Sequence, residues 1–170
     1  DPSTWLTYED AEATAGKHNC GIGLMLSPAE DEFDIVAFDL DKCRDPETSK
    51  LSVWAKELVE KADSYTEITP SGTGLRIIGI GSDTELHCDL PRDDDGHVEV
   101  YSRANRFITI TGNHFNGAAK PLADLSELVV SHRDEHLGHQ PAAGTRKHSF
   151  DDRKVERLID ELGQPGKWHN

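Results

Sequence analysis

The sequence predicts an α+β fold, in which helices pack against a mostly antiparallel sheet. Short segments rich in β-branched and aromatic residues outnumber segments with a helical period, and several of them follow one another directly along the chain. Gly, Pro, Asn and Asp separate these segments, as expected for turns between strands. A chain of 170 residues fits one domain, or one domain with a small appendage.

The first half of the chain is expected to hold two helices and two strands. Thr7 can cap a short helix over residues 9–15, and apolar runs at residues 22–26 and 34–41 indicate strands. A second helix is expected over residues 51–62. Apolar side chains recur there at steps of three and four: Leu51, Trp54, Ala55, Leu58, Val59 and Ala62.

The second half returns to short strands, with an acidic loop expected at residues 83–95 and a short helix at residues 122–130. The expected strands are residues 65–69, 75–80, 98–101 and 107–111.

Three parts of unequal size are expected along the chain. Residues 1–135 would form the main domain, as a fragment of a longer protein, and residues 136–147 lack periodicity and contain Gly and Pro, which predicts a linker. Residues 148–170 would begin a C-terminal helical segment, because Val155, Leu158 and Leu162 lie on one helical stripe.

Composition excludes several classes of protein. No apolar run approaches the roughly 20 residues needed to cross a bilayer, so no membrane association is expected. The start of the chain has no positively charged segment followed by an apolar one, so no secretory signal is predicted. Three widely spaced cysteines give no disulfide framework, which favours a reducing, cytoplasmic location.

The formal net charge of −14 argues at first against a nucleic-acid partner. The charge is uneven, however: residues 1–70 carry 6 basic and 16 acidic side chains, a net of −10. Without the acidic loop, residues 71–120 carry four basic side chains and one acidic, a net of +3. We therefore expect weak, salt-sensitive binding of DNA by this chain alone.

Two carboxylates share one face of the strand at residues 34–41. Side chains alternate across a strand, so Asp39 and Asp41 point away from the core face formed by Val36 and Phe38. Their repulsion is best relieved by a divalent cation, and oxygen ligands suit magnesium or manganese. The alternative is a polar strand end at a solvated edge. An EF-hand loop starting at Asp39 is excluded, because Arg44 replaces the Gly that its turn needs.

A third carboxylate, Glu99, is predicted on the outward face of the strand at residues 98–101, opposite the inward Val98 and Val100. It can join Asp39 and Asp41 if the two strands are neighbours.

A Gly-rich turn at residues 69–77 combines hydroxyls and an arginine between two strands. Glycine lets backbone amides approach an anion, Ser71 and Thr73 can donate hydrogen bonds, and Arg76 can bind phosphate with both prongs of its guanidinium. No Walker A lysine follows, and the alternative is a hairpin turn in which Gly72 supplies a positive φ.

Residues 101–114 place basic residues in a turn and small polar residues at the end of the next strand. Arg106 leaves the turn, and Thr111 and His114 lie at or beyond the strand end. The alternative is an ordinary hairpin with solvated arginines. His87, Cys88 and His97 flank the acidic residues 89–95, and a zinc site with Cys43 is a weaker alternative because the ligand spacing matches no known pattern.

The combination of these motifs resembles the archaeo-eukaryotic primase superfamily. A strand ending in Asp39-Leu40-Asp41, the turn Ser71-Gly72-Thr73-Gly74-Leu75-Arg76, an outward Glu99 and the stretch Arg106 to Gly112 occur in that order. The likeness is greatest to the primase-polymerase domains of replication proteins from phages, plasmids and other mobile elements. It implies an RRM-like sheet flanked by helices.

The resemblance also implies roles for individual residues. Asp39, Asp41 and Glu99 would be catalytic and hold two Mg²⁺ or Mn²⁺ ions. A larger set would bind the nucleotide: Ser71, Gly72, Thr73, Arg76, Arg106, Thr111 and His114. Many members have His where Arg76 stands, and Arg cannot shuttle a proton at neutral pH, so acid/base catalysis is not expected at this position.

The expected function is therefore template-dependent nucleotidyl transfer by a DNA primase or polymerase. Its partners would be (d)NTPs, a single-stranded DNA template and a primer, with a helicase or another replication domain in the full-length chain. A metal-dependent nuclease or phosphohydrolase would use the same carboxylates, and a non-catalytic module that binds nucleotide or DNA for replication initiation is the third alternative.

Overall fold

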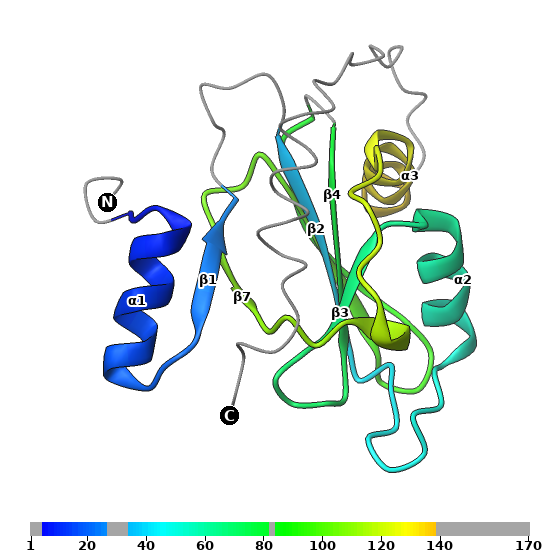
Figure 1. The fold of residues 1–170 in the computed structure, drawn as a ribbon. Coiled ribbons are helices and arrows are strands. Elements are labelled where there is room, and N and C mark those ends of the chain that lie inside the picture. Colours follow the sequence, from blue (N-terminus) through cyan, green and yellow to red (C-terminus); the bar gives the residue numbers. More distant parts are fainter. Residues whose placement is uncertain (1–4, 27–33, 82–83, 139–170) are drawn as a thin grey trace.

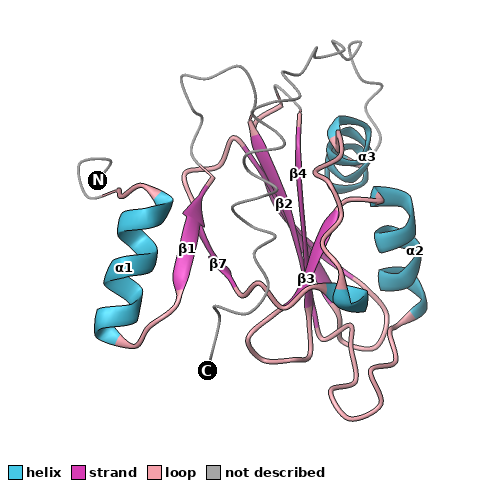
Figure 2. Ribbon diagram, in the orientation of Figure 1, coloured by secondary structure: helices cyan, strands magenta, loops and turns pink. Residues whose placement is uncertain are grey.

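The computed structural model describes residues 5–26, 34–81 and 84–138. Its elements form layers, in which helices α2 (Val53–Ala62) and α3 (Ser126–Leu137) lie on one side of a five-stranded sheet (Figure 1). A two-stranded ribbon lies on the other side, with helix α1 (Tyr8–His18) outside it (Figure 2). The predicted α+β fold is confirmed. None of the helices in the described part of the chain is long and apolar enough to span a membrane.

All pairings between the named strands are antiparallel. The large sheet has the order β3-β4-β2-β6-β5, and the ribbon pairs β1 with β7. The strands are β1 (Ile22–Met25), β2 (Ile35–Asp41), β3 (Tyr65–Ile68), β4 (Leu75–Ile80), β5 (Leu86–Pro91), β6 (His97–Ser102) and β7 (Phe107–Ile110). A short 3₁₀ helix, η2 (Phe115–Gly117), follows β7.

Local chemistry sets the ends of the first two helices. The Thr7 hydroxyl accepts a hydrogen bond from the Asp10 amide (3.2 Å) and caps α1, as predicted. Helix α2 starts at Val53, two residues later than expected, because Leu51 forms a β-bridge with Arg44. Both helices end at a residue in the left-handed conformation.

Three expectations about the second half of the chain need correction. Residues 86–91, expected within the acidic loop, form strand β5, whose side chains alternate strictly between buried and exposed. The helix expected over residues 122–130 is α3, which begins at Ser126 because the preceding segment pairs with β4: the Leu125 amide donates to the Ile80 carbonyl (2.9 Å). Helix α3 continues to Leu137, so it overlaps the start of the expected linker, and the C-terminal segment 148–170 lies outside the described residues.

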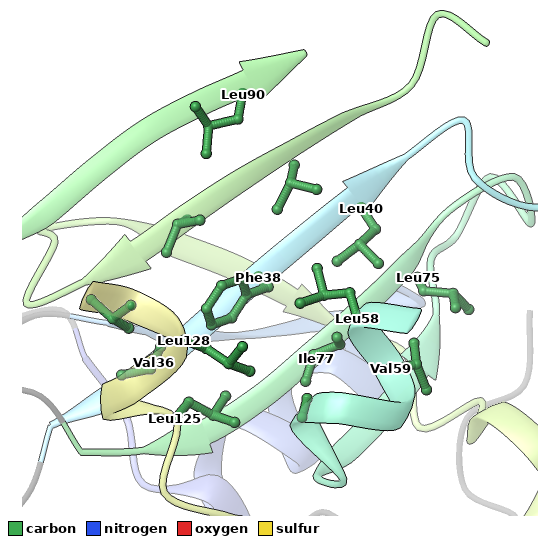
Figure 3. Packing of buried hydrophobic residues seen from close by; sticks show 14 of the residues in the cluster. Val36, Phe38, Leu40, Leu58, Val59, Leu75, Ile77, Leu90, Leu125 and Leu128 are labelled. Carbon is green, nitrogen blue, oxygen red and sulfur yellow. The ribbon is translucent and has the colours of Figure 1, made fainter. Parts of the chain in front are cut away.

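The main core lies between the sheet and helices α2 and α3 (Figure 3). From β2, Val36, Phe38 and Leu40 all point into it and are fully buried. A second apolar cluster lies on the opposite face of the sheet, beneath the β1–β7 ribbon, and includes Ala37, Ile78 and Ile110. The rest of that second face carries the polar residues described next.

Candidate active site

One row of charged side chains crosses the five-stranded sheet on the face opposite helices α2 and α3. Directly opposed residues on neighbouring strands share a face of a sheet, and the register aligns one residue from each strand. We call this set the polar row: Glu67 (β3), Arg76 (β4), Asp39 (β2), Glu99 (β6) and Asp89 (β5). The strands that carry Asp39 and Glu99 are therefore neighbours, which is the condition for Glu99 to join Asp39 and Asp41.

Asp41 lies one step along β2 from the polar row. It is paired in register with His97, whose ring lies 4.0 Å from the Asp41 carboxylate and 3.2 Å from that of Asp89. Asp41 and the polar row together hold five carboxylates and one guanidinium, a formal net charge of −4. Such a concentration of like charge favours binding of cations.

Arg76 is the internal counter-charge of the polar row. Its guanidinium donates to the Asp39 carboxylate (2.8 Å) and to the Thr109 carbonyl, and it lies 3.8 Å from the Glu67 carboxylate. Its side chain is 8% exposed. The predicted contact of Arg76 with a triphosphate stays a prediction, and in this structure the guanidinium is engaged with protein groups.

Asp39 combines a fixed oxygen with a free one. Oδ2 accepts the hydrogen bond from Arg76, whereas Oδ1 is buried and receives no hydrogen bond from the described residues. Burial raises the pKa of Asp39, and repulsion from Asp41 and Glu99 acts in the same direction, although Arg76 opposes both. A buried carboxylate oxygen without a partner is suited to bind a metal ion.

Glu67 is fully buried at the β3 end of the polar row. Its carboxylate accepts hydrogen bonds from the Tyr65 hydroxyl (2.9 Å) and from the amides of Thr111 and Gly112 (3.1 Å each). Burial raises the pKa of Glu67, and these donors together with Arg76 oppose the shift. The Tyr65 hydroxyl and the two amides all donate to this carboxyl, which therefore acts as an acceptor in each of these contacts.

Tyr101 lies between Glu99 and the pair of His87 and Arg106. Its hydroxyl donates to the Glu99 carboxylate, and burial together with this contact raises the pKa of Tyr101 to about 12. The His87 ring stacks on Tyr101 at 4.9 Å, and the guanidinium of Arg106 lies over the Tyr101 ring at 5.5 Å. His87 and Arg106 also line a hollow of about 270 Å³.

The turn of Ser71, Gly72 and Thr73 lies at the end of the sheet where Asp41 ends β2. Leu40 is paired with Leu75, the first residue of β4, so the connection from β3 to β4 ends beside the last residue of β2. Gly72 has a φ of +74°, and the Ser71 hydroxyl makes hydrogen bonds with the Thr69 (3.1 Å) and Thr73 (2.9 Å) hydroxyls. The structure thus brings the turn and the carboxylates to one region, as predicted from the sequence.

Arg44 holds this turn from the loop that follows β2. Its amide donates to the Thr73 carbonyl (2.9 Å), and its guanidinium donates to the Gly72 carbonyl (2.7 Å) and the Ser49 hydroxyl (2.6 Å). Sequence analysis did not assign Arg44 to the site.

Thr111 and His114 border the site through β3. The Thr111 hydroxyl donates to the Ile68 carbonyl (2.8 Å), and the His114 ring meets the Tyr65 ring edge to face at 5.4 Å. Burial lowers the pKa of His114, which favours the neutral ring. Arg106 lies farther away, beyond Tyr101, so the predicted nucleotide-binding residues surround the polar row at separate places.

Among the described residues, no group of three or more His, Cys, Asp or Glu side chains is placed so that it could hold a metal ion. The residues of the zinc alternative lie on opposite faces of the sheet, because Cys43 and Cys88 are buried in the core beneath the helices whereas the neighbouring His87 is exposed. Burial raises the pKa of Cys43 to about 11, so its thiol stays protonated at neutral pH.

Glu67 and Asp89 are members of the polar row that sequence reasoning missed. The alternation in β3 places Tyr65 and Glu67 on one face, and the alternation in β5 does the same for His87 and Asp89. Both alternations were available in the sequence, but only the sheet order shows that they lie in line with Asp39.

Comparison with known proteins gives one informative match. No family model matches the chain. A curated relative, the DNA primase-polymerase of Nitratiruptor phage NrS-1, is 31% identical over 176 aligned positions that cover 99% of this chain. The chain is a homologue of part of a phage primase-polymerase. It spans 23% of the length of that relative.

The primase-polymerase match confirms the resemblance inferred from the motifs. It extends over nearly the whole chain, so it includes Asp39, the turn at Ser71 and Glu99 rather than one short segment.

Proposed function

We propose that this chain is a template-dependent nucleotidyltransferase domain that acts as a DNA primase or polymerase in replication. It would join incoming (d)NTPs to the 3′-hydroxyl of a primer on a single-stranded DNA template. The main support is that Asp39 and Glu99 lie directly opposite each other on β2 and β6, with Asp41 one step away and the Ser71 turn at the same end of the sheet. The primase-polymerase relative supports the same activity.

The carboxylates fit Mg²⁺ or Mn²⁺ in their chemistry. Asp39, Asp41 and Glu99 supply only oxygen donors, and Asp39 Oδ1 has no hydrogen-bond partner among the described residues. These three residues would hold two ions. When bound, the ions would lower the pKa of the attacking hydroxyl and neutralise the pyrophosphate leaving group.

The turn of Ser71, Gly72 and Thr73 would bind the triphosphate. Its hydroxyls can donate to phosphate oxygens, and the absence of a side chain at Gly72 lets the backbone approach an anion. Arg44 would keep the turn in place through the Gly72 carbonyl. Thr111 and His114, beside β3, and Arg106, beyond Tyr101, would then contact the nucleotide or the template from separate places around the polar row.

Primer extension tests this proposal directly. A labelled primer on a DNA template is incubated with the 170-residue chain, nucleotides and MgCl₂ or MnCl₂. We expect Asp39→Asn, Asp41→Asn and Glu99→Gln each to reduce extension by about a hundredfold or more, because charge stabilisation of this kind dominates such reactions. Glu60→Gln is the matched control, since Glu60 is an exposed carboxylate on α2 that pairs with Lys56.

Undiminished extension by the Asp39 and Asp41 variants contradicts the proposal. Two further outcomes would favour the alternatives. Shortening of the labelled DNA with metal but without nucleotides would indicate a nuclease. Calorimetry showing metal-dependent nucleotide binding, together with no extension by the wild-type chain, would indicate a non-catalytic binding module.

A further inference from the structure

Glu67 has two carboxylate oxygens with different partners. Oε2 accepts hydrogen bonds from the Tyr65 hydroxyl and from the amides of Thr111 and Gly112. Oε1 shares the Thr111 amide and lies 3.8 Å from Nη1 of Arg76. One side of this buried group therefore holds the chain that follows β7, and the other side faces the polar row.

Arg76 is shared between Glu67 and Asp39. Its two terminal nitrogens differ in their contacts: Nη2 donates to Asp39, and Nη1 donates to the Thr109 carbonyl and faces Glu67. Because Thr109, Thr111 and Gly112 are close in sequence, the end of β7 and the residues after it contact both Arg76 and Glu67. Glu67 and Arg76 thus join β3, β4 and the end of β7 around Asp39.

The charge of Glu67 affects how strongly Arg76 holds Asp39. Because Nη1 faces Glu67, Arg76 holds Asp39 through Nη2 alone; without the Glu67 charge, Nη1 can turn to Asp39 Oδ1 and make the ion pair bidentate. Arg76 and a divalent cation compete for Asp39, because both are cations that bind its carboxylate. Loss of the Glu67 charge would therefore make Asp39 less available to a metal ion.

We propose that Glu67 is a positioning residue. It fixes residues 111–112 beside the site and keeps Nη1 of Arg76 turned away from Asp39, so that Asp39 Oδ1 stays open to a divalent cation. The second part rests on the proposed function, in which Asp39 is a metal ligand.

The substitution Glu67→Gln separates the two contacts. Glutamine keeps one acceptor oxygen for Tyr65 and the two amides but removes the charge that faces Arg76. We expect the dissociation constant for Mn²⁺, measured by calorimetry on the 170-residue chain, to rise about tenfold. Tyr65→Phe is the matched control, because it removes a hydrogen bond to the same carboxylate without changing any charge, and it should shift Mn²⁺ affinity much less than Glu67→Gln does.

A double-mutant cycle distinguishes this positioning role from a merely structural one. In an Asp39→Asn background, Glu67→Gln should cause no further loss of Mn²⁺ affinity, because the effect is transmitted through Asp39. Equal losses in both backgrounds, or no loss in the wild-type background, would overturn the inference.

Hydrogen exchange, measured without any metal, tests the contact of Glu67 with the Thr111 and Gly112 amides. Glu67→Ala should speed exchange of the Thr111 and Gly112 amides by about tenfold or more, and Glu67→Gln should have a smaller effect. Unchanged protection in Glu67→Ala would overturn this part. If the wild-type chain binds no Mn²⁺ through Asp39, the proposed metal site and the Asp39 part of the inference both fail. The exchange result decides separately whether Glu67 holds residues 111–112.

Discussion

The two faces of strand β2 hold their side chains in different ways. Phe38 and its apolar neighbours are fixed by close packing against α2 and α3 (Figure 3). Asp39, the next residue, is held by an ion pair with Arg76. Packing tolerates little change in volume, and the polar face instead depends on a balance of charge. The helix-side face should therefore determine stability, and the polar face should determine chemistry.

The largest expected effect on stability comes from the helix-side face. Phe38→Ala should lower the free energy of unfolding by about 3–5 kcal/mol, because Phe38 is fully buried and a cavity would remain. Chemical denaturation measures this loss, and Phe38→Leu should lose less than half as much. Asp41→Asn, on the other face and half exposed, should change stability by less than about 0.5 kcal/mol although it removes a proposed metal ligand. Equal losses for Phe38→Ala and Asp41→Asn would contradict the division between the faces.

A second test concerns Gly79 in β4, which has no room for a side chain on the helix side. A Cβ atom there would lie 2.5 Å from Leu125 Cγ and 2.6 Å from the Ala123 carbonyl oxygen. Gly79→Ala should cost about 1–3 kcal/mol of stability in thermal or chemical unfolding. Gly16→Ala is the control, because a Cβ at Gly16 of α1 meets nothing within 4 Å and should stabilise the helix by up to about 1 kcal/mol.

The smallest expected effect is a change in how stability depends on pH. Burial lowers the pKa of His132, which packs edge to face on Phe38 at 5.1 Å in the helix-side core. Between this lowered pKa and about 6.5, the unfolded chain binds more protons than the folded chain, so stability falls as the pH falls through that window. We expect His132→Gln to flatten this slope in denaturation experiments from about pH 7 to about pH 5.

The other groups with shifted pKa values are present in both wild type and His132→Gln, so they do not account for a difference in slope between the two. His114 has a lowered pKa and contributes a slope of the same sign, which remains in the His132 variant. Asp39 and Glu67 have raised pKa values, so each contributes stability that is lost as the pH rises through its folded pKa. An identical slope in wild type and His132→Gln would show that His132 does not contribute.

Much of the fold and part of the site follow from local patterns in the sequence. Alternation placed Asp39, Asp41 and Glu99 away from the core before the sheet order was known, and the structure confirms this placement. Strand β5 was missed because its acidic neighbourhood indicates a loop, even though Leu86, Cys88 and Leu90 alternate with polar residues.

The rest depends on contacts between distant segments. The segment before α3 looks helical from its apolar residues, yet it pairs with Ile80 of β4, more than forty residues earlier. Glu67 and Arg76 meet Asp39 only because β4 lies between β3 and β2, and the sequence alone does not specify that order. Local periodicity therefore predicts faces of strands, whereas partners across the sheet require the tertiary fold.

The central position of β2 also bears on how the site comes into being during synthesis. Asp39 precedes its partner Glu99 by sixty residues, and β2 is hydrogen-bonded to β4 and β6, which are both made later. At roughly 5–20 residues per second, a ribosome needs roughly 3–12 s to make the intervening chain. Asp39 and Asp41 are therefore made well before Glu99, and the set of three carboxylates is complete only after β6 has been synthesised.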